Sequence, residues 1–232
     1  IVTHLFKFMD VSMDLQFAEI IPQMGPMLWG ALNTIYVGLF ACGVGLMVGT
    51  GLLFLRNSRF RLLRILVGIY GSFIRGTPAL VQILVLYFVL APLTGLNIGP
   101  FTAGILAIGF NSGAYVAEIL RGGLSRIPPG QWEAARALGL PDYKIWFKII
   151  LPQVFYSVIP ILVGEFTMVI KLTPLLSTIT LVELTRSSQM LYNETFRPVE
   201  VLILAAVIYF IICFSISQYG EHLQRRSVKY RL

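Results

Sequence analysis

The stretch that decides the fold is Glu133-Ala134-Ala135-Arg136-Ala137-Leu138-Gly139, followed after nine residues by Ile149-Ile150-Leu151-Pro152. Its first six residues are strong helix formers, and Gly139 can adopt the left-handed conformation that ends a helix. A second short helix is expected to begin at Asp142. Five basic residues lie between positions 121 and 148, and long apolar stretches flank this segment on both sides. We therefore expect a compact, water-facing projection of two short helices between two membrane spans. Glu-Ala-Ala taken alone would indicate only an ordinary alanine-rich surface helix.

The composition is that of an integral membrane protein. Of the 232 residues, 56% are hydrophobic and only 12% are charged, whereas a soluble surface carries about a quarter or more of charged residues. At roughly 20 residues for each span, the chain has room for five transmembrane helices in a single transmembrane domain, residues 1–232. The net charge of +7 would also suit a nucleic-acid-binding protein. The basic residues adjoin apolar stretches, however, so membrane topology explains them better, and no nucleic-acid partner is expected.

Apolar stretches predict an all-α integral membrane fold with five spans. Glycines recur along the first span, and small residues allow helices to pack closely in lipid. Pro78 lies inside the second span and lacks a backbone N–H, so the helix is expected to kink or unwind there. Residues 1–23 are too charged to span and are expected to lie on the bilayer surface. The spans are expected at about 27–55, 65–91, 101–120, 149–170 and 199–219, with the projection in a loop at about 121–148 and a further loop at 171–198.

The distribution of basic residues predicts the orientation. With five spans, the segment 56–64, the loop 121–148 and the C-terminal tail lie on one side of the membrane. These three regions hold four, five and four of the 18 Lys and Arg residues. Basic residues accumulate on the cytoplasmic side. The sequence therefore predicts an N-terminus outside, a C-terminus inside and a cytoplasmic projection.

No residue pattern indicates catalysis within this chain. It has no G-x-x-x-x-G-K-[ST] phosphate-binding loop, and no intramembrane group of His, Asp or Ser such as a membrane enzyme would need. Cys42 and Cys213 lie in apolar runs and are expected to be small core residues rather than a disulfide or a metal pair. We expect no catalytic residue, no metal site and no cofactor in the chain. A secondary transporter or a channel would also be apolar, but neither explains the pattern at 133–152.

Four further motifs accompany that pattern. They are Arg75-Gly76-Thr77-Pro78 with Gln82, Ala114-Tyr115-Val116-Ala117-Glu118, Ile127-Pro128-Pro129-Gly130-Gln131 and Ile170-Lys171. Across residues 32–210 the chain resembles the permease subunits of ABC importers, and in particular the polar amino-acid uptake family of the histidine, glutamate, glutamine, arginine and opine group. One departure is Lys171-Leu172-Thr173-Pro174, where the group usually has Lys-Asp-Thr-Ser. The lost acid and the added proline leave the conformation of this outer loop open.

The resemblance implies a type I importer, in which the permease moves a polar amino acid inward and performs no covalent chemistry. A second permease subunit, identical or homologous, would complete the pathway, and two ATPase subunits would hold ATP and Mg. An extracytoplasmic solute-binding protein would dock on the outer face. The projection would dock into a groove of the ATPase, with Glu133, Ala134, Ala135 and Gly139 as the expected coupling residues. The expected location is the bacterial plasma (inner) membrane. A related importer for another small polar solute is the alternative, because the binding protein selects most of the substrate.

Polar side chains inside a bilayer need a partner or a function. Counted along their spans at about 1.5 Å per residue, Arg75, Asn111 and Glu165 share the middle-to-outer part of the membrane. They are the expected substrate-pathway residues. Glu165, beyond a break at Pro160, would accept an ammonium group, Asn111 would face it, and Arg75 would bind the carboxylate. The alternative is an internal Arg75–Glu165 ion pair that braces two kinked helices. Glu118 lies near the cytoplasmic end of its span and is expected to form a cap or an ion pair there.

Overall fold

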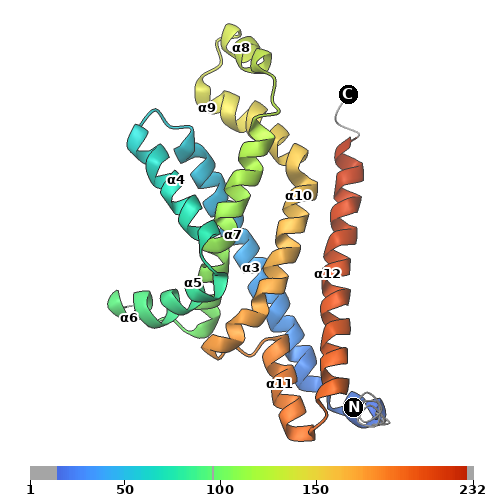
Figure 1. Cartoon of the computed structure of the whole chain (residues 1–232). Coiled ribbons are helices and arrows are strands. Elements are labelled where there is room, and N and C mark those ends of the chain that lie inside the picture. Colours follow the sequence, from blue (N-terminus) through green and yellow to red (C-terminus); the bar gives the residue numbers. More distant parts are fainter. Residues whose placement is uncertain (1–14, 96, 229–232) are drawn as a thin grey trace, which may run out of the picture.

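The computed structural model describes residues 15–95 and 97–228, and this part of the chain contains helices and no strands (Figure 1). The predicted all-α fold is therefore confirmed. The first 14 residues of the expected surface segment lie outside the described residues. The last residues of that segment form two short helices, α2 (Phe17–Ile20) and the 3-10 helix η1 (Ile21–Gln23).

Four helical segments of the described chain are long and apolar enough to cross a membrane. They are α3 (Gly25–Arg56), α7 (Pro100–Leu124), the segment Asp142–Ile179 and α12 (Pro198–Val228). A strongly bent pair of helices between α3 and α7 passes the same test together and supplies the fifth. Each segment contains one of the stretches that the sequence predicts as spans.

Helices α3 and α7 form the centre of the fold, and glycines allow them to approach closely. A Cβ atom at Gly49 would lie 2.5 Å from Val116 Cγ1, and one at Gly113 would lie 2.6 Å from Val48 Cγ1. The expectation that glycines of the first span serve helix packing is confirmed at such positions. It is wrong for Gly43 and Gly51, where a Cβ would meet nothing within 4 Å.

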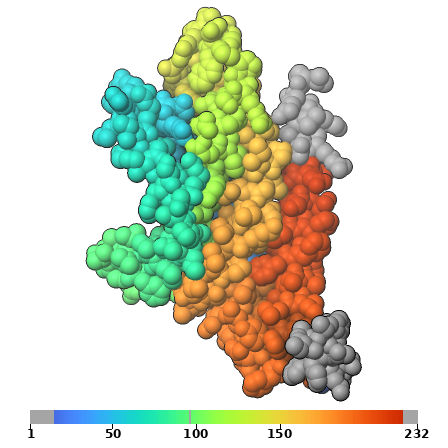
Figure 2. Space-filling model, in the orientation of Figure 1, coloured from blue at the N-terminus to red at the C-terminus, as the bar shows by residue number. Residues whose placement is uncertain are grey.

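The second span is broken rather than continuous. Helix α4 (Arg61–Gly76) ends before Thr77 and Pro78, which are both extended, and helix α5 (Ala79–Val85) leaves at an angle of 110°. The chain continues through the π-helix η2 (Leu86–Leu90) into α6 (Ala91–Leu93). The predicted break at Pro78 is therefore confirmed, and its size turns the expected span into two arms. Figure 2 shows the second arm standing out from the side of the body.

The fourth span is longer than expected and does not break. After α8 (Pro129–Ala137), the chain forms α9 (Asp142–Lys144), the π-helix η3 (Ile145–Ile150) and α10 (Leu151–Leu172). Pro160 lies inside α10, which runs through it as an α-helix. The expected irregularity at Pro160 is therefore wrong. Val158 and Leu162, on either side of the proline, are both buried in one hydrophobic cluster, which keeps the helix in place.

The segment expected as a loop at 171–198 is mostly helical. The 3-10 helix η4 (Thr173–Ile179) begins with Pro174 in its first turn, so the departure from the family pattern fits this conformation. Helix α11 (Leu184–Thr195) follows, and the Glu183 carboxylate accepts hydrogen bonds from the N–H groups of Thr185 and Arg186. The loop prediction is wrong because Leu184 and Leu191 find buried positions against α3 and α12, which a sequence without long-range contacts does not reveal.

The elements gather at two opposite ends of the molecule (Figure 1). The turn between α3 and α4, the helices α8 and α9, and the end of α12 lie at one end. Helix α11 and the start of α12 lie at the other. The basic α3–α4 turn and the basic segment 121–148 therefore share one end of the fold, as five alternating spans require.

Candidate functional site

The carbonyl groups freed at the end of α4 are bound by side chains. Thr77 Oγ1 donates to Phe73 O over 2.8 Å. Gln82 Nε2, from the first turns of α5, lies 2.8 Å from Ile74 O, 2.8 Å from Thr77 Oγ1 and 3.1 Å from Thr77 O. These contacts replace the backbone hydrogen bonds that a continuous helix would make. Gln82 therefore holds both arms of the break at their angle.

Asn111 joins this group from α7. Its Nδ2 donates to Gln82 Oε1 over 2.9 Å, and the residue is only 6% exposed. Gln82 also lines a cavity of about 380 Å³ between the two arms and α7, otherwise enclosed mainly by apolar side chains. Sequence reasoning noted Gln82 only as part of a motif. Its distance of four residues from Pro78 was the available signal, because one helical turn brings it back to the break.

Glu165 is held by the neighbouring residue of α7. Ser112 Oγ donates to Glu165 Oε1 over 2.8 Å, and Glu165 is half-buried. Asn111 and Ser112 are adjacent in the chain, and successive residues of a helix point about 100° apart. One therefore faces α5 and the other faces α10. The expectation that Asn111 faces Glu165 is wrong by this one position.

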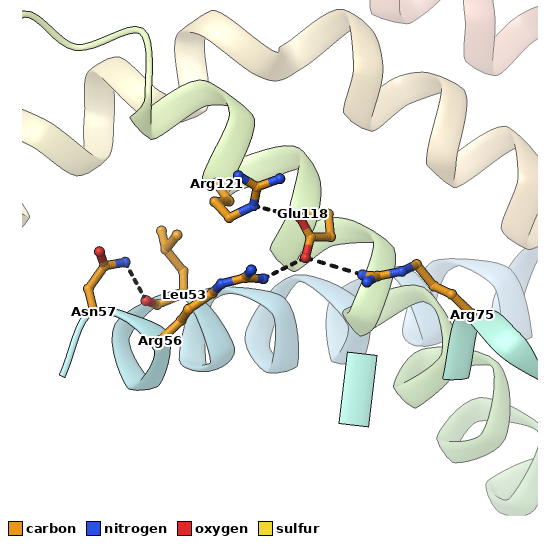
Figure 3. Close-up of polar contacts among 6 residues, drawn as sticks. All are labelled: Leu53, Arg56, Asn57, Arg75, Glu118 and Arg121. Atoms are coloured by element: carbon orange, nitrogen blue, oxygen red, sulfur yellow. Dashed lines mark hydrogen bonds and ion pairs between the residues drawn. The ribbon is translucent and has the colours of Figure 1, made fainter. Parts of the chain in front are cut away.

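Arg75 belongs to a different cluster, shown in Figure 3. Its Nη1 lies 3.3 Å from Glu118 Oε1, and Arg56 Nη1 lies 2.5 Å from the same oxygen. Arg121 Nε binds the other oxygen, Oε2, over 2.6 Å. One carboxylate thus joins the end of α3, the last turn of α4 and the last turns of α7. The ion pair expected at Glu118 is present.

The structure therefore separates the three residues that the sequence grouped as a pathway. Arg75 pairs with Glu118, and the internal Arg75–Glu165 pair is not formed. The depth counted along the backbone was misleading, because the Arg75 side chain runs back along α4, where a Cβ at Gly71 would lie 3.3 Å from its Nη1. Asn111 and Glu165 remain linked, through adjacent positions on α7. Within the described ranges, no three His, Cys, Asp or Glu side chains lie together as a metal site would require.

The projection has the predicted form. Gly139 has φ +70°, and its N–H donates to Arg136 O while the N–H of Leu140 donates to Ala135 O. This pair of bonds is the Schellman ending of a helix. The predicted left-handed stop is confirmed. Glu133, Ala134 and Gly139 are exposed, whereas Ala135 is buried in the hydrophobic cluster beneath.

Aromatic contacts attach the projection to the spans. The rings of Trp132 in α8 and Trp146 in η3 meet edge to face with centroids 5.1 Å apart. Phe54, near the end of α3, lies 5.3 Å from Trp146 by the same measure. Gln153 Nε2 of α10 donates to Gln131 Oε1 of α8. A force on α8 would therefore reach both α3 and α10 through packed side chains.

Comparison with known proteins agrees with this arrangement. Residues 41–229 match the family described as "Binding-protein-dependent transport system inner membrane component". The arginine transport system permease protein ArtQ of Bacillus subtilis (strain 168) is 34% identical over 214 residues, which are 92% of this chain and 98% of ArtQ. The L-cystine transport system permease protein TcyB of the same organism is 39% identical over 176 residues, which are 75% of each chain.

Solved structures extend the likeness to the fold. A chain of a crystal structure titled as an amino acid ABC transporter with histidines superposes with a TM-score of 0.82 and 33% identity, covering 92% of this chain and 100% of the other. A chain of the inward-facing MetNI methionine ABC transporter reaches a TM-score of 0.71 at 21% identity, covering 88% and 98%, which shows the fold alone. The chain therefore belongs to the family of binding-protein-dependent transport system inner membrane components, as a multi-pass permease subunit of an ABC transporter.

Proposed function

We propose that this permease carries a polar amino acid inward in an ATP-driven type I importer. The observation that carries the proposal is the exposed α8 projection, which is packed through Trp132, Trp146 and Phe54 onto two spans. Relatives named for arginine, glutamine, cystine and octopine transport support an amino acid as cargo. A permease for another small polar solute is the second candidate.

The partners follow from this role. ATPase subunits holding ATP and Mg would receive the projection, with Glu133, Ala134 and Gly139 on its exposed surface and Ala135 packed beneath it. A second permease subunit would complete the pathway, and a solute-binding protein would deliver the amino acid from outside. The chain itself would hold no nucleotide. The setting would be the inner membrane of a bacterium.

Within the spans, we assign the pathway to Glu165 and Asn111. Glu165 is half-buried on α10 and keeps one carboxylate oxygen beyond the one that Ser112 occupies. A carboxylate in a membrane interior can accept hydrogen bonds from an α-ammonium group or a basic side chain. Arg75, sequestered by Glu118, is assigned to positioning α4 rather than to the cargo.

The orientation is proposed from charge. The end of the molecule that carries the projection also carries the basic α3–α4 turn, which supports a cytoplasmic location for it. A cysteine at Ser125, which is exposed beside the projection, should resist an impermeant thiol reagent added to intact cells. A cysteine at Asn193, exposed on α11, should react. The reverse pattern would overturn the orientation.

Gly139→Val tests the coupling role. Valine at φ +70° is strained by at least about 1–2 kcal/mol, although its Cβ would meet no neighbour. ATP-dependent uptake by the reconstituted complex should fall about tenfold or more while the permease stays assembled. Gly139→Asn should retain uptake, because asparagine tolerates this conformation.

Gly95→Val is the matched control for strain alone. Gly95 also has φ +70° and free space around its Cβ, but it lies in the turn after α6, far along the chain from the projection. It should lower stability to a similar degree without uncoupling uptake from ATP hydrolysis. Wild-type uptake by Gly139→Val would refute the coupling role.

A further inference from the structure

We propose that Gln82 is a positioning residue that fixes the polarity of Asn111, so that the pathway meets a carbonyl oxygen there and the cargo must present an N–H donor. The inference rests on the proposed pathway role of Asn111 and adds to it the chemistry of the site. It is carried by the hydrogen bonds at the break between α4 and α5.

The orientation of the Gln82 amide is determined by neighbouring groups that can only accept hydrogen bonds. Backbone carbonyls only accept hydrogen bonds. Gln82 lies within 3.1 Å of two of them, Ile74 O and Thr77 O. Its amide must therefore turn the NH₂ group toward α4, and the opposite orientation would place an oxygen against two oxygens. The hydroxyl of Thr77 agrees, since it donates to Phe73 O and can accept from Gln82.

The next amide is then determined as well. Because the Gln82 nitrogen faces α4, only its Oε1 faces α7. Asn111 must therefore donate from Nδ2 to this oxygen, which lies 2.9 Å away. Asn111 Oδ1 accepts no hydrogen bond from the described residues. Every buried side-chain nitrogen or oxygen among those residues has a partner. Oδ1 therefore reaches accessible space, although the residue as a whole is only 6% exposed.

Ser112, the residue next to Asn111, binds a second acceptor group, the carboxylate of Glu165. Ser112 occupies Oε1 of Glu165, so Oε2 is the further acceptor of that carboxylate. The Glu165 carboxylate on α10 and the Asn111 amide oxygen on α7, linked through the adjacent residues Asn111 and Ser112, make the proposed pathway a site rich in acceptors. Such a site fits an ammonium or guanidinium group, which carries several N–H donors and no acceptor. A cargo group with oxygen alone would meet repulsion.

The test is a pair of substitutions in the complete complex with its ATPase and binding protein. The cargo probe is the best-transported member of a panel of radiolabelled amino acids that includes L-arginine and L-glutamine. Gln82→Met removes the polarity constraint, so Asn111 can flip and KM should rise about tenfold, the usual weight of a hydrogen bond to a charged group. Asn111→Asp alone should also raise KM, because its oxygen would face Gln82 Oε1.

The double variant distinguishes the proposal from a merely structural role. With Gln82→Met and Asn111→Asp together, both faces of residue 111 are oxygen and no constraint is needed, so KM should return toward the wild-type value. A structural role predicts that the double variant is at least as impaired as the worse single variant, and that result would overturn the proposal. Gln23→Met, at an exposed glutamine near the N-terminus, is the control for replacing a glutamine by methionine as such.

Two further measurements keep the outcomes separate. Asn111→Leu should raise KM if Asn111 lines the pathway. An unchanged KM would remove Asn111 from the pathway and overturn this inference with it, whereas a raised KM without rescue overturns the inference alone. If Gln82→Met fails to assemble, the thermal unfolding of the two Asn111 variants tests the proposal instead. Asn111→Asp should then lower the unfolding midpoint at least as much as Asn111→Leu, and a wild-type midpoint for Asn111→Asp would mean that Gln82 can turn freely.

Discussion

Pro78 and Pro160 both lie within apolar stretches that are predicted to be helical, yet the helix breaks only at Pro78. At Pro78 the chain turns by 110° between α4 and α5. At Pro160 the helix α10 continues from Leu151 to Leu172. Each proline removes one backbone donor and crowds the carbonyl four residues before it. The different outcomes must come from the surroundings.

At Pro78, hydrogen bonds from neighbouring side chains replace the backbone hydrogen bonds that the helix loses. The carbonyls of Phe73 and Ile74 bind Thr77 and Gln82, and Glu118 binds Arg75 in the last turn of α4. At Pro160 the packing opposes a break, because Val158 and Leu162 are buried in one cluster on both sides of it. The proline and Tyr156, whose carbonyl it leaves without its helical donor, lie on the exposed face of α10. A proline thus marks where a helix can break, and its neighbours decide whether it does.

The largest effect is expected for Glu165, the proposed pathway residue on the unbroken helix α10. Glu165→Gln should raise the KM of uptake about 10- to 100-fold, because hydrogen bonds to a charged group contribute about 1.5–3 kcal/mol. Assembly and thermal stability should be retained, since glutamine can still accept from Ser112. Glu194→Gln, on the exposed part of α11, is the control. Normal uptake by Glu165→Gln would remove this residue from the pathway, and a loss of stability would assign it a structural role.

The second effect concerns the anchor of the broken helix. Glu118→Gln leaves three arginines without their carboxylate and should lower the free energy of unfolding by about 1–2 kcal/mol, reduced by the partial exposure of the cluster. The matched variant is Asp142→Asn. Its pair with Arg136 is longer, at 3.7 Å, and more exposed, so a change of under about 0.5 kcal/mol is expected. Thermal unfolding at low and high salt measures both. Equal shifts for the two variants would argue against an anchor at Glu118.

A smaller effect compares the same hydrogen bond in the two settings. Thr77 Oγ1 and Thr167 Oγ1 each donate to the carbonyl four residues before them, over 2.8 and 3.0 Å. At the break this carbonyl has lost its helical donor, whereas inside α10 it keeps one. Thr77→Val should therefore cost about 1 kcal/mol in stability, and Thr167→Val clearly less. Thermal unfolding midpoints of the two purified variants decide, and equal losses would mean that side chains do not hold the break.

The smallest effects should have opposite signs at the two prolines. Pro160→Ala restores a donor inside a continuous helix and should stabilise the protein, by up to about 1 kcal/mol. Pro78 has φ −63°, the value that the proline ring favours. Pro78→Ala should therefore destabilise by about 0.4–1 kcal/mol through the greater freedom of the unfolded chain. Shifts of the same sign in thermal unfolding would contradict the comparison.

Much of the fold could be predicted because it depends on neighbours in the chain. The apolar lengths indicated five helical segments. The glycine and the helix formers at 133–139 indicated a projection, and Gly139 indeed has φ +70°. The missing N–H of Pro78 located the break. Each of these features follows from residues within one or two helical turns, where propensity and backbone chemistry act without the rest of the molecule.

The pairing of polar side chains was decided by the tertiary structure alone. The sequence placed Arg75, Asn111 and Glu165 at similar depths. The packing of α4 beside α3 and α7 gives Arg75 to Glu118, and the rotation of α7 gives Asn111 to Gln82 and leaves Ser112 for Glu165. Depth along a helix follows from counting residues. Direction depends on how each helix is turned and bent against its neighbours, and only the packed structure fixes that.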